Sequence, residues 1–170
     1  MKAVSNAGPL IALGKLGRLV LLKQLYGPVL ISPEVYQEVV VNGLRRGEPE
    51  ASDVQFLIQS GDIKIVPVDL SSGDPLLAMG IDLGEAETLA LAQTEHADLV
   101  LIDNAHARRA ARSLDLPLKG TVGILLQALR SGILLLTDFE LLMNQIKHQP
   151  TLWISERLCD EALSLVRRKD

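Results

Sequence analysis

The sequence has little cysteine and few aromatic residues, and these scarcities exclude several classes of protein. The single cysteine in 170 residues, Cys159, cannot form an internal disulfide or a cysteine-rich zinc site. Aromatic residues make up 3% of the chain and hydrophobic residues 48%, so the core must consist mainly of Leu, Val, Ile and Ala. No apolar run is long enough to cross a membrane, and the N-terminus lacks the pattern of a secretory signal. We therefore expect one cytoplasmic domain spanning residues 1–170.

The chain also lacks an excess of positive charge and the best-known catalytic signatures. Its formal net charge of −4 disfavours wrapping nucleic acid by bulk charge, although a local basic patch remains open. Neither the serine-hydrolase pattern G-x-S-x-G nor the P-loop pattern occurs. Receiver-type phosphoacceptors and haloacid-dehalogenase-like phosphatases need acids after the first strand, where this chain has Asn6 and Ala7.

Short β-branched runs alternate with longer stretches of helical periodicity. This alternation predicts a mainly parallel central sheet covered by helices on both faces, a three-layer α/β/α sandwich. The expected strands are 3–5, 29–31, 63–66, 99–102, 116–118 and 153–154. The expected helices are 9–25, 33–46, 50–60, 83–95, 105–114, 122–131, 138–148 and 155–168.

Several helix starts carry capping signals. Ser32 precedes a proline at the first helical position, which favours an N-cap at the serine. Asp82 and Glu85 have the spacing of a capping box. Thr137 and Asp138 are expected to cap the helix that follows them.

Polar residues at strand ends are the first candidates for chemistry, because ligands of parallel sheets bind beyond the carboxyl ends of the strands. Asn6 follows the first expected strand, Asp103 follows the strand at 99–102, and Thr121 follows the run LPLKG. Asp103 is the strongest candidate, since Asn104 can cap the next helix and leave the aspartate available.

Acids on the expected helices supply further candidates. The capping box accounts for Glu85, whereas Glu87 lies about 200° around the helix from it and points either into a cleft or along an edge. Glu38 is one turn after Glu34 and by itself fits a solvated face. Carboxylates that converge from strand ends and helices would suit Mg²⁺ or Mn²⁺, which prefer oxygen ligands and can activate water near a phosphoryl group.

Positive charge is concentrated after the Asp103 strand. Arg108, Arg109 and Arg112 lie on one expected helix, and basic residues beside an acidic centre suit a polyanionic substrate. A solvated helix face is the alternative interpretation of this run.

Five segments, in order from about residue 3 to residue 154, resemble the PIN domain superfamily. They are SNAGPLIALGKLGRL, ISPEVYQEV, LGEAETLALA, ADLVLIDNAHARRAA and LKGTVGILL. The similarity is greatest to a toxin-like branch of bacterial and archaeal PIN proteins that includes VapC-type toxins. It implies an α/β/α fold, Mg²⁺- or Mn²⁺-dependent cleavage of RNA, a small antitoxin protein as partner, and a homodimer.

The resemblance also implies roles for individual residues. Asp103, Glu87 and Glu38 match acids of the catalytic metal site, and Asn6 stands where the family has an aspartate. Ala7 stands where the family has a hydroxyl residue, so the first motif departs at two positions. The RNA-binding residues expected beside this site are Arg108, Arg109, Arg112 and Thr121.

Two functional hypotheses follow from this departure. In the first, the chain is an active endoribonuclease in which Asn6 is a neutral metal ligand, because an amide oxygen can bind a cation but adds no charge. In the second, the chain is a PIN-fold module that binds RNA or a protein partner without cutting. Cleavage assays on the wild type and on the Asp103→Asn and Asn6→Asp variants discriminate between them.

Overall fold

The computed structural model describes residues 1–72 and 74–168 and divides the chain into two compact units. The first unit is Met1–Lys119 and the second is Gly120–Asp170. Nothing in this division tests the expectation of one domain over residues 1–170, which stays a prediction. Within the described residues, no helix combines the length and hydrophobicity needed to span a membrane.

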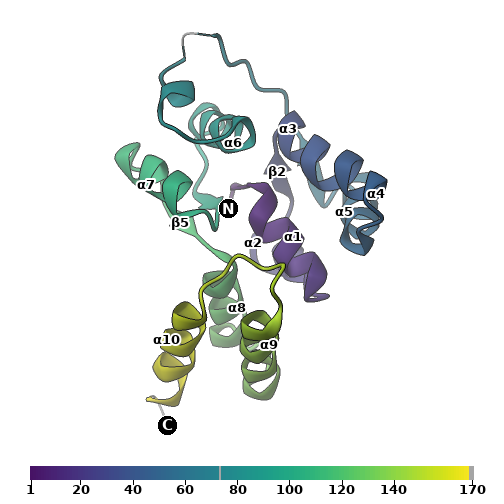
Figure 1. The fold of residues 1–170 in the computed structure, drawn as a ribbon, viewed down its shortest axis with the longest axis vertical. Helices are drawn as coiled ribbons and strands as arrows, with labels where there is room; N and C mark the ends of the chain where they lie inside the picture. The colour runs from purple at the N-terminus through teal and green to yellow at the C-terminus, as the bar shows by residue number, and fades with distance from the viewer. Residues whose placement is uncertain (73, 169–170) are drawn as a thin grey trace. The chain divides into compact units, whose positions relative to one another are not determined.

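The first unit contains a five-stranded, entirely parallel sheet (Figure 1). The strands are β1 (Ala3–Ser5), β2 (Val29–Ile31), β3 (Ile63–Ile65), β4 (Leu99–Leu101) and β5 (Leu118–Lys119). Their order is β3-β2-β1-β4-β5, and Val4 of the central strand is in register with Leu30 on one side and Val100 on the other. The parallel sheet with flanking helices confirms the predicted α/β class.

The helices of the first unit connect successive strands. They are α1 (Ala7–Lys15), α2 (Val20–Tyr26), α3 (Pro33–Tyr36), the π-helix (Gln37–Asn42), α4 (Gly43–Arg45), α5 (Pro49–Gln59), the 3₁₀ turn (Pro75–Ala78), α6 (Leu83–Thr94) and α7 (Ala105–Ser113). The second unit consists of α8 (Thr121–Arg130), α9 (Leu136–His148) and α10 (Glu156–Arg167).

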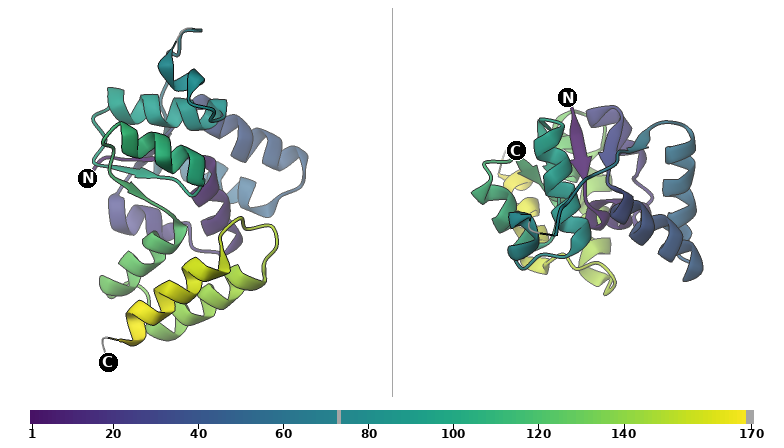
Figure 2. Two further views of the ribbon diagram at one scale, coloured as in Figure 1. Left: turned by 60° about the vertical axis from the view of Figure 1, so that its left-hand side comes forward. Right: turned by 90° about the horizontal axis from the view of Figure 1, so that it is seen from above.

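The strand order places these connections on both faces of the sheet. The chain moves outward from β1 through β2 to β3 and then crosses to β4 and β5, so right-handed crossovers put the two sets of helices on opposite faces. On one face Val4, Val100 and Ile102 pack with Leu89 of α6 and Ala107 of α7. Figure 2 shows α6 and α7 side by side over the sheet.

Most of the predicted caps are present. The Ser32 hydroxyl accepts a hydrogen bond from the Val35 amide at 3.2 Å. In the capping box, the Glu85 amide donates to Asp82 at 2.7 Å and the Asp82 amide donates back to Glu85 at 3.1 Å. Asn104 caps α7 by accepting from two backbone amides, so Asp103 is not needed there, as predicted.

Two long predicted helices differ from regular α-helices. The helix expected over 9–25 breaks between Lys15 and Val20, where Gly17 has a φ of +64° that ends the first segment. The helix expected over 33–46 is continuous, but its middle widens into the π-helix, a change that the apolar spacing did not reveal.

Three expected boundaries or elements were wrong. Residues 153–154 form no strand, and the Trp153 side chain, which the strand prediction would place in the sheet, is 96% exposed. Thr137 and Asp138 do not cap α9. The N-cap is Leu135, and both residues lie in the first turn of the helix. The last strand is β5 at Leu118–Lys119 rather than at 116–118.

Candidate functional site

Asn6 and Asp103 lie at the point where the order of the sheet reverses. They follow β1 and β4, the two adjacent strands from which the chain proceeds in opposite directions. The backbone amide of Asn6 donates to the Leu101 carbonyl at 2.9 Å, which fixes the end of β1 beside the end of β4. Parallel α/β sheets bind ligands in the crevice outside this switch point. The two residues therefore share the most favourable place in the fold for a site.

The first turn of α1 lies against the Asp103 side chain. A Cβ built on Gly8 would lie 3.5 Å from the Asp103 Cβ and 3.6 Å from its Oδ2. The Asn6 backbone is extended at the N-cap of α1, and its side chain, 7% exposed, makes no capping hydrogen bond. The side-chain amide group of Asn6 can therefore interact with other groups at the strand end.

Thr88 of α6 contacts the Asn6 side chain, a contact that the sequence did not suggest. Its hydroxyl lies 2.7 Å from the Gly84 carbonyl and 3.4 Å from the Asn6 Oδ1. A hydroxyl donates one proton, so the shorter bond to Gly84 takes it, and the contact with Asn6 is weak. The Asn6 oxygen thus keeps capacity to accept from, or bind to, another group. The available sequence signal was a threonine in the middle of an Ala- and Leu-rich helix, and the structure shows that it is fully buried.

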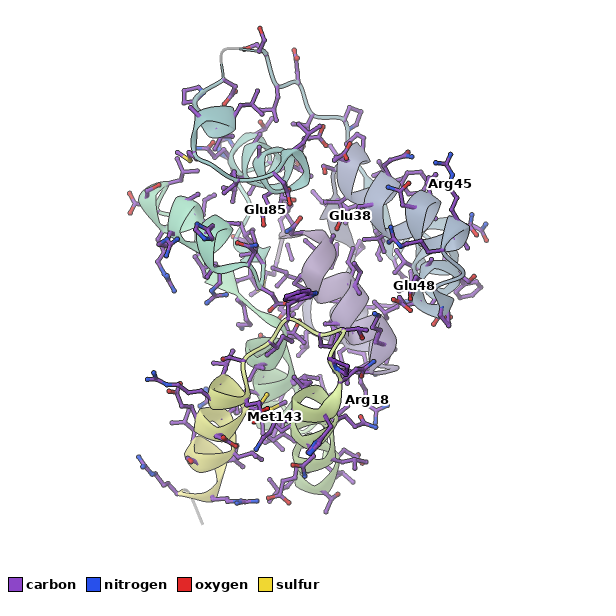
Figure 3. The ribbon with its side chains drawn as sticks, in the orientation of Figure 1. Arg18, Glu38, Arg45, Glu48, Glu85 and Met143 are labelled. Carbon is purple, nitrogen blue, oxygen red and sulfur yellow. The ribbon has the colours of Figure 1, made fainter. Side chains whose placement is uncertain are left out.

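Glu38 lies on the π-helix and faces the start of α6. A Cβ on Gly84 would lie 3.7 Å from the Glu38 Oε2, so this carboxylate faces the start of α6, and Figure 3 shows Glu38 and Glu85 on the facing elements. Burial raises the pKa of Glu38, the negative charge of Asp82 raises it further, and Arg46 partly opposes the shift. Single-turn π-helices often occur at functional sites.

The two acids of α6 have different partners. The Glu87 Oε2 accepts a hydrogen bond of 3.0 Å from the backbone amide of Glu34, at the start of α3. Glu85 is buried in its capping box, and this burial raises the pKa of its carboxyl group. The sequence assigned Glu85 to capping, as found, but it did not suggest that Glu87 contacts another helix.

The arginines of α7 do not form one exposed patch. The Arg108 Nη1 donates to the Ile102 carbonyl at 2.8 Å, and its half-buried guanidinium is held beside Asp103. Burial and the charge of Arg112 lower the pKa of Arg108, while Asp103 acts in the opposite direction. Arg109 and Arg112 are exposed, and Arg109 lies 2.7 Å from the His106 Nδ1. These two arginines are the better placed to contact a substrate.

Thr121 belongs to the second unit. It is the first residue of α8 and is fully buried. In the first unit, Asn6 and Asp103 follow the adjacent strands β1 and β4, and Glu38 faces the start of α6. The predicted contact of Thr121 with RNA stays a prediction.

A divalent cation fits the donor chemistry of the strand ends but not a closed protein cage. Among the described residues, no three acidic, histidine or cysteine side chains lie close enough to hold one ion. The Asp103 carboxylate and the Asn6 amide oxygen are nevertheless ligand types that hard cations prefer. Mg²⁺ commonly uses one or two carboxylates and completes its coordination with water and substrate phosphates. The residues therefore fit an ion shared with a phosphate group.

Comparisons with known proteins identify a family for this chain. A family model described as "DUF3368: PIN domain" matches residues 2–168. No curated protein and no solved structure matches the chain significantly.

Proposed function

The chain belongs to the PIN-domain family, and from this premise we propose that it is a metal-dependent endoribonuclease whose site is the β1–β4 edge. The observation that supports the proposal best is the position of Asn6 and Asp103 at the switch point of the parallel sheet. Glu38 adds a second carboxylate beside the start of α6. Oxygen ligands of this kind suit hydrolysis of a phosphodiester with a bound divalent ion.

Asp103 and Asn6 would hold Mg²⁺ or Mn²⁺, with Glu38 as a further acid of the site. When bound, the ion would supply charge neutralisation on the phosphate and an activated water. Glu38 has a pKa raised by burial, so its carboxyl group can hold or release a proton nearer neutral pH than an exposed glutamate can. The resemblance matches Glu87 to an acid of the metal site, but its carboxylate accepts a hydrogen bond from the Glu34 amide, so we assign it to the attachment of α3 rather than to the ion.

The RNA backbone would be bound by exposed arginines of α7. Arg109 and Arg112 follow Asp103 on the helix that leaves the site, so they can contact phosphates next to the scissile one. Arg108 and Thr121 are less accessible. A local contact of this kind is compatible with a net charge of −4.

The partners and cellular setting are proposed from the resemblance to toxin-like PIN proteins. The chain would be the toxin of a cytoplasmic toxin–antitoxin pair, inhibited by a small antitoxin protein, and would form a homodimer. Light scattering at high protein concentration tests the dimer, and a monomeric mass there would contradict it.

A non-cutting PIN module that binds RNA or a protein is the second candidate. It is favoured by the neutral Asn6 side chain and by the lack, in the described residues, of three acids around one point. Fewer charges in the site lower the affinity for a divalent ion.

Cleavage of a labelled RNA in MnCl₂ separates the two candidates. We expect the wild type to cut and Asp103→Asn to lose about tenfold or more of the rate, by analogy with the loss of a group that orients a metal. Asp53→Asn makes the same chemical change on an exposed position of α5 and should cut like the wild type. Wild-type RNA binding without cutting supports the module, and unchanged activity of Asp103→Asn contradicts the proposed site.

A further inference from the structure

Glu87 makes a contact that links α6 to an element far away in the sequence. Its carboxylate accepts from the Glu34 amide at 3.0 Å, across a separation of 53 residues. Glu34 lies in the first turn of α3, and this helix runs directly into the π-helix that carries Glu38. The side chain of Glu87 is therefore joined to the start of the segment that presents Glu38.

The amides at the start of α3 show why Glu87 is needed there. Pro33 has no N–H, the Val35 amide donates to the Ser32 hydroxyl, and the Tyr36 amide donates to the Ser32 carbonyl. The Glu34 amide is the remaining first-turn donor, and a helix of this kind has no backbone acceptor for it. Glu87 supplies the acceptor, and its negative charge is favourable at a helix N-terminus.

The same part of α6 also faces Glu38. Gly84 lies three residues before Glu87, and a Cβ on it would meet both the Glu34 Cγ and the Glu38 Oε2 at 3.7 Å. These are ordinary van der Waals distances, so the start of α6 lies close to both glutamates. The hydrogen bond from Glu34 to Glu87 and the close approach of Gly84 are therefore two separate contacts between α6 and the segment that carries Glu34 and Glu38.

We infer that Glu87 is a positioning residue: by accepting from Glu34 it fixes α3 and the π-helix against α6, and so holds Glu38 at the site. Its primary role is then to be an acceptor at a helix end, for which the charge is helpful but not essential. The importance of Glu38 rests on the proposed function, whereas the attachment of α3 to α6 does not.

The test compares Glu87→Gln, which keeps an acceptor oxygen, with Glu87→Ala, which removes it. We measure hydrogen exchange of the Glu34 amide by NMR, and RNA cleavage in MnCl₂. Glu87→Ala should speed exchange of the Glu34 amide about tenfold, the usual effect of losing a capping side chain. Glu87→Gln should keep both the slow exchange and most of the cleavage rate. Gln93→Ala, an equal truncation on the exposed side of α6, is the control.

Two results would overturn the inference. One is unchanged exchange of the Glu34 amide in Glu87→Ala. The other is a Glu87→Gln variant with native exchange that loses cleavage as severely as Asp103→Asn, because the charge of Glu87 would then act on an ion. If Glu87→Ala does not fold, native exchange and cleavage in Glu87→Gln still support the inference. If the wild type does not cut RNA, the proposed function fails, and the exchange rates alone decide the role of Glu87.

Discussion

Replacing Asn6 by aspartate would restore the charge that the PIN pattern has at this position, and its energetic effect can be worked out from the fold. Asn6 is 7% exposed and follows β1, while Asp103 follows the adjacent strand β4. Neighbouring strands lie about 4.8 Å apart. Ser5 is in register with Leu101, so Asn6 is opposite Ile102 and Asp103 is one residue further along. At an effective dielectric constant of about 20, two carboxylates no closer than the strand spacing repel by at most about 3.5 kcal/mol.

This repulsion is an upper limit, because one of the two acids can take up a proton instead. We therefore expect Asn6→Asp to lower the free energy of unfolding by about 1–3 kcal/mol without metal. For a chain of this size the melting temperature should fall by roughly 3–10 °C. Saturating MnCl₂ should restore more stability to the variant than to the wild type, since an ion at about 100 times its Kd adds about 2.7 kcal/mol.

The assay is thermal unfolding with and without MnCl₂. Asn104→Asp is the matched control, because it adds the same charge where the side chain already accepts from the His106 and Ala107 amides of α7. Aspartate caps helices as well as asparagine does, so the control should melt like the wild type without metal. If Asn6→Asp melts like the wild type and responds no more strongly to Mn²⁺, then residue 6 does not face Asp103 and the proposed ion site is wrong.

Three further variants test the packing and the electrostatics. In Gly14→Ala the new Cβ would lie 2.5 Å from the Glu50 Cβ, so overpacking should cost about 1–3 kcal/mol of unfolding free energy in urea denaturation. Gly84→Ala, which meets only ordinary contact distances, should be tolerated far better, and equal stability of the two variants would contradict this packing. The folded state raises the pKa of Glu38, mainly through burial, so stability is greatest below the usual glutamate pKa and falls as the pH rises through the folded value. Glu38→Gln should therefore melt at a higher temperature than the wild type at neutral pH, and its melting temperature should depend less on pH. If the pH dependence of the melting temperature is unchanged, Glu38 does not cause it.

The sheet and the strand-end residues could be predicted from local signals. The β-branched runs that became β1, β2 and β4 are short, buried and flanked by helical periodicity, so their class and direction followed from pattern alone. Asn6 and Asp103 could be placed at strand ends for the same reason. Their adjacency required the strand order, which depends on packing of residues nearly 100 positions apart.

The remaining features depend on contacts that a linear pattern does not contain. Glu87 pairs with an amide 53 residues away, and Thr88 meets Asn6 across 82 residues. The apolar spacing of a π-helix differs little from that of an α-helix over six residues. The π-helix that carries Glu38 could therefore not be predicted from that spacing. Trp153 was assigned to a strand because aromatic and β-branched neighbours favour one, although no partner strand pairs with it among the described residues.

The location of a bound ion decides whether the β1–β4 edge is a metal site. Mn²⁺ broadens the NMR signals of nearby amides, so MnCl₂ can be titrated into labelled protein with an uncleavable RNA analogue present. We expect the NMR signals of the backbone amides of Asn6, Gly8 and Asp103 to broaden first. Broadening that begins instead at the acidic residues of α10, such as Asp160 and Glu161, would contradict a cation site at the β1–β4 edge.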